Sequence, residues 1–436
     1  MLSAQTVRIS GVKETMRSIT FMSASWAMKT LWLLPGESVE GEIEPMMAAP
    51  AMAGWKPART MSGIIVGPSA AAEPAALGTA TATQLATSMQ PGQNNAITDV
   101  EGVLVGQVNV HDDKKGAHTG VTAILPHGGN LFKEKVPAGI FLANGFGKMT
   151  GYPQVKELGN IETPIVLVNT LNVAAGLDGI IDYTFSFKEN GDCRSVNGVV
   201  GETNDGGIND IRARFLTSKD VLKAIQTAKS GPVEEGVVGA GSGTKAFGFK
   251  GGIGTSSRKL PASMGGYTVG VLVQTNFGGF LNVDGVAVGE KLGGYPWQKE
   301  IECADGSIMM VVATDAPIDA RNLERVAKRA FMGLAKAGGI ASNGSGDFAI
   351  AFSTAKENRV PHNTKKLEKL QNVNVANDDM TPIFMATIEA TEEAVVNSLF
   401  KAKDVKGYNG KVTKALPVDQ VLEMLKAEGK IVKQPR

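Results

Sequence analysis

Side chains that often build reactive or metal-binding sites are scarce in this chain of 436 residues. It has only two cysteines, Cys193 and Cys303, which stand far apart and form no CxxC pair. One disulfide between them remains open, but a disulfide framework or a cysteine zinc site is excluded. The four histidines show no HExxH spacing, so neither a histidine metal site nor a serine–histidine pair is indicated.

Long apolar runs and an excess of one charge are missing as well. No run of 18 apolar residues is present, so no membrane-spanning helix and no membrane partner are predicted. The formal net charge of +1 gives no basic surface, so we expect no nucleic-acid partner. What is present is an ordinary hydrophobic content of 43% with 53 glycines, which is typical of a globular protein with many tight turns.

Residues 1–90 differ in composition from the rest of the chain. They are rich in Met, Ala, Ser, Thr and Pro without a sustained period, which predicts a low-complexity leader that is disordered or serves targeting. Ala51-Met52-Ala53 is similar to a signal cleavage site, but the segment before it has several glutamates and no long apolar core. A misassigned start explains the segment equally well, so the compartment stays open between cytoplasm and periplasm.

The remainder, residues 91–436, is predicted to be one domain of class α/β. Strands outnumber helices and come in clusters, which indicates layered sheets with helices outside. Strands are expected within 103–110, 119–125, 138–143, 163–170, 199–206, 267–276, 307–314 and 348–353. Helices are expected at 172–182, 218–230 with Ser218 as N-cap, 319–337, 381–400 with Thr381 as N-cap, and 418–428.

The run Asn343-Gly-Ser-Gly-Asp347, which precedes an apolar strand, is the most informative stretch. Glycines on both sides of Ser345 remove side-chain bulk and permit backbone angles closed to other residues. An ordinary turn explains such a run by itself. Alternatively, breaking the Gly344–Ser345 bond would make Ser345 a new N-terminus whose amine could act as its own base.

That second interpretation needs no histidine. A free α-amine titrates near ~7.7–8.0, well below a lysine amine at ~10.4, so it is partly neutral near pH 7 and can accept the hydroxyl proton. Two rival motifs fail on spacing. Gly239–Lys245 lacks the GxxxxGK[ST] pattern of a phosphate loop, and the glycines beside Ser345 do not form GxSxG.

Several motifs follow one another in order between about Asn95 and Ala402. They are Asn95-AITDVEG, Asn144-GFG, Glu162-TPI, Asn169-TLN, Val200-GETNDGGIND, Phe249-KGGIGTSSR, Val273-QTNFGG, Ala313-TDAP, Asn343-GSGD and Glu389-ATEEAVVNSL. Together they resemble the DmpA-type self-cleaving aminopeptidases (L-aminopeptidase D-esterases), which include the β-peptidyl aminopeptidases.

The resemblance implies a four-layer αββα sandwich, like that of the ornithine acetyltransferases and resembling N-terminal nucleophile hydrolases. It also implies cleavage into an α chain of 91–344 and a β chain of 345–436 that stay together. A homo-oligomer of such αβ units is implied, with no metal and no organic cofactor.

The resemblance further implies roles for single residues. Ser345 is similar to the nucleophile, with Gly344–Ser345 as the cleavage site, and Asn276 to the oxyanion donor. Glu202 is similar to the carboxylate that receives the substrate amine. Asn204 stands where the family often has a tyrosine, which puts substrate preference in question. Without the family, Asn276 could equally be a turn cap and Glu202 a solvated acid.

The family also has a Ser-x-Glu pair after the nucleophile. Its best match is Thr387-Ile388-Glu389, with threonine replacing serine, so Thr387 and Glu389 are predicted to be catalytic. Thr391-Glu392-Glu393 offers a second register, and a charged helix face explains both.

The sequence therefore predicts a self-processing serine aminopeptidase or amidase. Its substrates would be short peptides, including β-peptides, amino-acid amides or esters with a free amine. Two alternatives stay open: an ornithine-acetyltransferase-like acyltransferase, whose nucleophile is normally threonine, and a binding protein that is never cleaved.

Overall fold

The computed structural model describes residues 17–22, 28–33, 89–294, 306–362, 369–370 and 372–430. Two compact units result, Met1–Glu73 and Pro74–Arg436. In the first unit, β1 (Arg17–Met22) pairs with β2 (Met28–Leu33) in an antiparallel hairpin. The rest of the predicted leader, including Ala51–Ala53, lies outside the described residues, so the leader stays a prediction.

The larger sheet of the second unit has seven strands in the order β11-β12-β13-β14-β5-β15, with β6 also paired to β5. Only β13 and β14 run parallel; the other pairs in this sheet are antiparallel. The strands are β5 (Glu134–Gly145), β6 (Asn160–Ile161), β11 (Ile253–Lys259), β12 (Thr268–Asn276), β13 (Ser307–Thr314), β14 (Gly346–Ser353) and β15 (Val360–Pro361).

A four-stranded sheet in the order β3-β4-β7-β8 faces the larger one. Its strands are β3 (Leu104–Asp112), β4 (Ala117–Leu125), β7 (Ile165–Asn169) and β8 (Val199–Thr203). Two small hairpins lie outside both sheets: β9 (Lys245–Ala246) with β10 (Phe249–Lys250), and β16 (Val405–Lys406) with β17 (Val412–Thr413).

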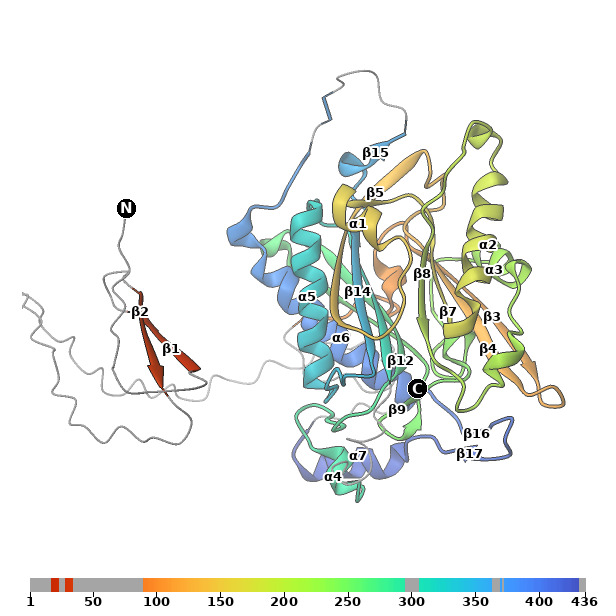
Figure 1. Ribbon diagram of the computed structural model, residues 1–436, viewed down its shortest axis with the longest axis vertical. Helices are drawn as coiled ribbons and strands as arrows, with labels where there is room; N and C mark the ends of the chain where they lie inside the picture. The colour runs from red at the N-terminus through yellow and green to blue at the C-terminus, as the bar shows by residue number, and fades with distance from the viewer. Residues whose placement is uncertain are drawn as a thin grey trace, which may run out of the picture. The chain divides into compact units, whose positions relative to one another are not determined.

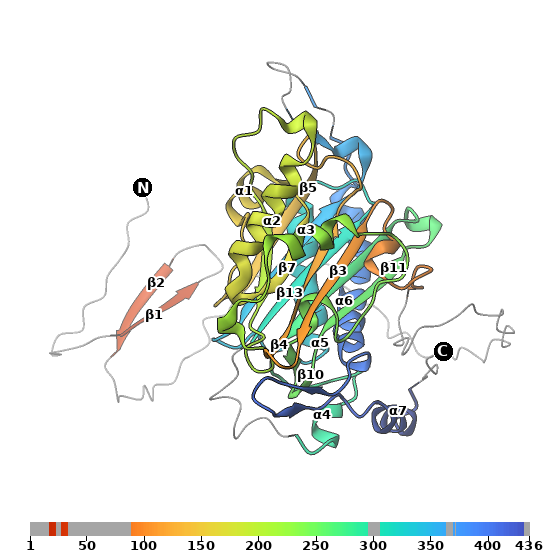
Figure 2. The ribbon, with the colours of Figure 1, turned by 90° about the vertical axis from the view of Figure 1, so that its right-hand side faces the viewer.

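Helices cover the outer face of each sheet, so the unit has four layers, αββα (Figure 1). Helices α5 (Ala320–Lys336) and α6 (Thr381–Phe400) pack on the larger sheet, and α2 (Val173–Phe185) and α3 (Ser218–Gln226) pack on the smaller one (Figure 2). The remaining helices are α1 (Tyr152–Leu158), α4 (Val288–Lys291) and α7 (Val418–Ala427).

Three buried apolar clusters match these layers. One lies between the two sheets and includes Met309, Phe348 and Ile350, another lies between the larger sheet and α5 and α6, and the third lies under α2 and α3. Strand β14 alternates between two of them, because Phe348 and Ile350 face the other sheet while Ala349 faces the helices. Its eight residues are all buried, so the residues at its start are anchored from both sides.

The predicted elements of the second unit are largely confirmed, because their apolar periods are strong. Two N-cap assignments are wrong by one residue. Thr217, not Ser218, caps α3 and hydrogen-bonds Asp220 at 2.8 Å through its hydroxyl, and Met380 precedes α6, so that Thr381 is already helical. The buried strand β11 was not predicted, since its centre, Thr255 to Arg258, is polar.

The close approach of α6 to β11 explains why residue 254 is a glycine. An added Cβ at Gly254 would lie 1.9 Å from the backbone oxygen of Ala394 in α6. Only glycine therefore lets α6 lie directly on β11 here.

Candidate active site

A tight turn presents Ser345 at the start of β14. The Ser345 N–H donates to the backbone oxygen of Ser342 at 2.9 Å, so the Gly344–Ser345 peptide is held inside the turn. The Ser345 carbonyl accepts from the Phe146 N–H at 3.1 Å and from the Asn144 side-chain amide. The same amide donates to the carbonyls of Ser342 and Asn343, each at 3.0 Å. The peptide groups around the predicted cleavage site are thus fixed.

The side chain of Ser345 is directed to a carboxylate. Ser345 is 1% exposed, and its Oγ donates to Asp347 Oδ1 at 2.6 Å. Asp347 is equally buried, and burial raises the pKa of its carboxyl to about 6, against the hydrogen bond from Ser345. Sequence reasoning quoted Asp347 only as part of the Asn343–Asp347 run and gave it no role.

A cavity of about 630 Å³ opens beside this turn, a size typical of small-molecule sites. Strand register brings its walls together, because Asn276 at the end of β12 pairs with Ser307, and Ser307 pairs with Gly346. From the smaller sheet, β8 contributes Glu202. The lining also includes Gly344, Phe146, Gly147, Lys148, Thr170, Asn204, Gly207, Lys245, Phe247 and Phe277. Ser345, the next residue after Gly344, is itself buried and is not one of the lining residues.

Asn276 is oriented as a donor toward the cavity it lines. Its Oδ1 accepts the backbone N–H of Lys245 at 3.1 Å, which assigns the other end of the amide, Nδ2, as the free donor. Within the described residues Nδ2 has no protein partner. A free side-chain N–H that lines a cavity is the kind of donor that can stabilise an oxyanion.

Glu202 is buried at 1% exposure, and its carboxylate is held by Lys148 and Thr170 of the cavity wall. Its Oε1 accepts from both the backbone N–H and the Nζ of Lys148, each at 3.0 Å, and its Oε2 accepts from the hydroxyl of Thr170. The Lys148 side chain is 52% exposed, so a substrate ammonium could replace it at Oε1. Sequence reasoning gave no role to Lys148, which follows the motif at 144–147, or to Thr170, which lies within the motif at 169–172.

Gly147 lets the turn that contains Ser345 lie close to Glu202. An added Cβ at Gly147 would lie 2.9 Å from the Cα of Gly346 and 3.5 Å from Oε1 of Glu202. Asn204, also in the wall, is exposed, and its Oδ1 accepts from the Gly206 N–H at 2.9 Å. The structure therefore brings Gly344, Asn276, Glu202 and Asn204 to one cavity, and Ser345 follows Gly344 in the chain.

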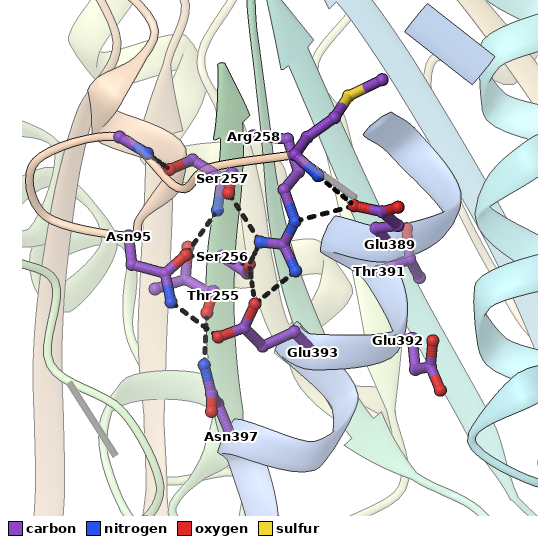
Figure 3. Close-up of polar contacts among 12 residues, drawn as sticks. Asn95, Thr255, Ser256, Ser257, Arg258, Glu389, Thr391, Glu392, Glu393 and Asn397 are labelled. Carbon is purple, nitrogen blue, oxygen red and sulfur yellow. Dashed lines mark hydrogen bonds and ion pairs between the residues drawn. The ribbon is translucent and has the colours of Figure 1, made fainter. Parts of the chain in front are cut away.

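The structure does not bring Thr387 and Glu389 to this cavity. The Thr387 hydroxyl donates to the backbone oxygen of Ile383 at 2.8 Å, inside α6. Glu389 lies 3.3 Å from Nε of Arg258 (Figure 3). Arg258 pairs in register with Val269, which lies at the end of β12 opposite to Asn276. Thr387-Ile388-Glu389 matches the family pair in sequence, but Glu389 lies at the end of the larger sheet opposite to Asn276.

At that end of the sheet Arg258 is fully buried in a polar network (Figure 3). This network explains why β11 can be buried although its centre is polar. Its NH2 donates to Glu393 Oε2 at 2.5 Å, and its NH1 donates to Ser256 Oγ at 2.9 Å. Asn95 joins the network by donating to Glu393 Oε1 at 2.8 Å. Both registers considered for the Thr-x-Glu pair therefore supply a carboxylate to one buried arginine.

Two histidines that the sequence separates come together across a hairpin. His111 pairs in register with His118, and Asp113 Oδ1 lies 3.4 Å and 3.6 Å from their Nε2 atoms. Among the described residues, this is the only group of three or more His, Cys, Asp or Glu side chains placed closely enough to share a metal ion, and none of its members lines the cavity. The sequence analysis did not find this group, because the pairing of β3 with β4 brings the two histidines together. Their separation along the chain does not indicate the contact. Burial lowers the pKa of His118.

Comparisons with known proteins agree with this geometry. The family model described as Peptidase family S58 matches residues 95–413, which is most of the second unit. The chain belongs to peptidase family S58. It is 42% identical over 360 residues to the β-peptidyl aminopeptidase BapA of Sphingosinicella microcystinivorans, covering 77% of this chain and 89% of the relative.

Solved structures give the same family. A Burkholderia β-aminopeptidase is 37% identical with a TM-score of 0.73, covering 79% of this chain and 97% of that one. The L-aminopeptidase D-Ala-esterase/amidase of Ochrobactrum anthropi, described as a variant of the N-terminal nucleophile hydrolase fold, is 35% identical with a TM-score of 0.73. It covers 79% of this chain and 97% of its own.

This S58 peptidase is accordingly a self-processing serine aminopeptidase or amidase with the αββα fold expected from the resemblance. The match to a peptidase family favours hydrolysis over the acyltransferase and over an uncleaved binding protein. Within the described residues, no helix has the length and apolar character that a bilayer crossing needs.

Proposed function

We propose that this S58 peptidase cuts itself between Gly344 and Ser345 and then removes N-terminal residues from short peptides, amides or esters. The observation that supports this most is the fixed turn that holds Ser345 next to Gly344, which lines the same cavity as Glu202. The α chain would span 91–344 and the β chain 345–436. The wall of the larger sheet would then supply the nucleophile, and the smaller sheet would supply the group that binds the substrate amine.

In the cleaved enzyme the α-amine of Ser345 acts as the base. It takes the proton of the Ser345 hydroxyl, and Oγ attacks the substrate carbonyl to form an acyl-enzyme. The Asn276 amide, held in donor orientation by Lys245, stabilises the oxyanion. Water then hydrolyses the acyl-enzyme and restores the hydroxyl. No step in this sequence requires a histidine, a metal or an organic cofactor.

Glu202 selects substrates with a free amine. Its Oε1 already holds the ammonium of Lys148 at 3.0 Å, and a substrate ammonium entering the cavity would take over this position. Because Asn204 replaces the tyrosine of the family pattern, no phenol contacts the reacting carbonyl from this loop. The relatives named β-peptidyl aminopeptidases support β-amino acids at the N-terminus of the substrate as one accepted class.

Cleavage at the proposed bond has a direct test. The purified protein should give two bands on a denaturing gel, and Edman sequencing of the smaller should begin Ser-Gly-Asp-Phe, as residues 345–348 read. A smaller band whose sequence begins at another residue would show that Ser345 is not the nucleophile of cleavage. A single intact chain of 45.6 kDa with full activity would contradict self-cleavage as the route to the active enzyme.

The role of Glu202 is tested by replacing it with glutamine. Glu202→Gln should lower kcat/KM for free-amine substrates by about tenfold to a hundredfold, because a hydrogen bond to a charged group contributes about 1.5–3 kcal/mol. Glu162→Gln is the matched control, since Glu162 is 3% exposed and pairs with Lys135 outside the cavity, and it should keep normal activity. Equal turnover of free and N-acetylated substrates by the wild type would refute the assignment of Glu202.

A homo-oligomer of αβ units, implied by the family resemblance, is also part of the proposal. Its support is the resemblance alone, and the mass of the purified enzyme in solution checks it.

A further inference from the structure

Self-cleavage poses a problem that the mature mechanism does not solve. Before the Gly344–Ser345 bond breaks, the nitrogen of Ser345 is an amide and cannot accept a proton. This N–H instead donates to the backbone oxygen of Ser342 at 2.9 Å. Another group must take the proton from the Ser345 hydroxyl in the intact chain. This inference rests on the cleavage site proposed above.

Asp347 is the titratable group that contacts Ser345. Its Oδ1 accepts from Ser345 Oγ at 2.6 Å, the short distance typical of a hydroxyl bound to a carboxylate. Its other oxygen, Oδ2, is buried without a hydrogen-bond partner among the described residues. The carboxylate is therefore held against the nucleophile and retains an unfilled position for a proton.

Other candidate bases are engaged elsewhere. None of the four histidines hydrogen-bonds to Ser345: His127 contacts the Glu134 carbonyl, His362 stacks on Phe132, and His111 and His118 lie at the β3–β4 hairpin. Glu202 holds Lys148 across the cavity, and Glu389 lies at Arg258.

We propose that Asp347 is the general base of self-cleavage, a catalytic role that is needed only in the intact chain. The carboxylate takes the proton of Ser345 Oγ, and Oγ attacks the carbonyl carbon of Gly344 to form a tetrahedral intermediate. The C–N bond then breaks, Asp347 returns its proton to the leaving nitrogen of Ser345, and Gly344 is left as an ester on Oγ. Water hydrolyses that ester, which gives the Gly344 carboxylate, the free hydroxyl and the new α-amine.

The surroundings of Asp347 fit a group that titrates near the working pH. Its register neighbours are Ile308 on β13 and Asn144 on β5, and neither carries a charge. In the last turn of α5, which packs on β14, the charged residue is Lys336, and it pairs with Glu392 at 2.5 Å. Burial alone thus keeps the pKa of Asp347 high, at about 6, so that the carboxylate is mostly ionised at pH 7 and is a stronger base than an exposed aspartate.

The test measures cleavage of the full chain rather than peptidase activity. Labelled full-length protein made by cell-free synthesis is diluted into buffers from pH 5 to pH 8, and the uncleaved fraction is followed on denaturing gels. For the wild type, the rate should fall by about tenfold per pH unit below pH 6, as expected for a base that becomes protonated. Asp347→Asn should cleave at least about a hundredfold more slowly, because the amide can still accept the hydrogen bond but not the proton.

Two further variants separate proton transfer from structure. Asp347→Glu, which keeps a base, should recover part of the lost rate. Asp315→Asn should retain the wild-type rate and pH profile, since Asp315 has a pKa that burial likewise raises but accepts from the Thr268 N–H at the other end of the sheet.

A folded Asp347→Asn chain that cleaves at the wild-type rate would overturn the proposal. So would a wild-type rate that does not change between pH 5 and pH 7, and this result decides the matter even if Asp347→Asn does not fold. A wild-type chain that is never cut before Ser345 would instead contradict the proposed cleavage site, which is a different outcome on the same gel.

Discussion

Replacing Ser345 by alanine is expected to leave a single uncleaved chain of 45.6 kDa that hydrolyses no substrate. The substitution removes the hydroxyl that attacks Gly344, and it also removes the nucleophile that would attack the substrate. Loss of a nucleophile of this kind costs at least about ten-thousandfold in kcat. Denaturing gels measure the first effect, and hydrolysis of amino-acid amides measures the second.

Ser353→Ala is the matched control for this substitution. Ser353 is a buried serine at the other end of the same strand, where its hydroxyl donates to the Ala316 carbonyl at 2.7 Å. Its replacement should leave cleavage and turnover intact. Two bands from Ser345→Ala, cut at the normal position, would show that another residue attacks the bond and would end the case for Ser345.

The second large effect concerns the stability of the second unit rather than its chemistry. Arg258→Met should lower the free energy of unfolding by about 3–5 kcal/mol, because the Arg258 cation would no longer offset the burial of the Glu389 and Glu393 carboxylates. The measurement is denaturant unfolding in the Ser345→Ala background, where the uncleaved chain unfolds as one molecule. Arg258 lies at the opposite end of the sheet from Ser345, so the loss should appear without any change at the cavity.

Two comparisons isolate the cause. Lys328→Met removes an exposed partner of Glu324 in α5 and should cost no more than about 1 kcal/mol. Adding Glu389→Gln and Glu393→Gln to Arg258→Met should restore part of the stability, since neutral amides need no cation. If Arg258→Met costs no more than Lys328→Met, the network of Figure 3 does not stabilise the fold.

The sequence was sufficient to predict a helix or strand wherever residues close together in the chain determine its structure. The apolar strand at 307–314 and the helix at 319–337 were predicted because each carries its own period, and both appear as β13 and α5. The ordered motifs from Asn95 onward were enough to indicate the family and its four layers. The scarcity of histidine pointed to a mechanism without a histidine base. The polar strand β11 escaped prediction because the groups that satisfy its side chains, Asn95 and Glu393, come from distant parts of the chain.

What the sequence by itself determined is therefore the set of elements, the family and the run that contains Ser345. The tertiary structure alone decided which side chains meet. It placed Asn276 and Gly346 at one end of a sheet through strand register, brought Glu202 to them from the other sheet, and directed Glu389 to Arg258 at the far end. The physical reason is that spacing along the chain governs contacts only within a helix turn or a strand. Contacts across hundreds of residues depend on the pairing of strands and the packing of layers, which no short motif encodes.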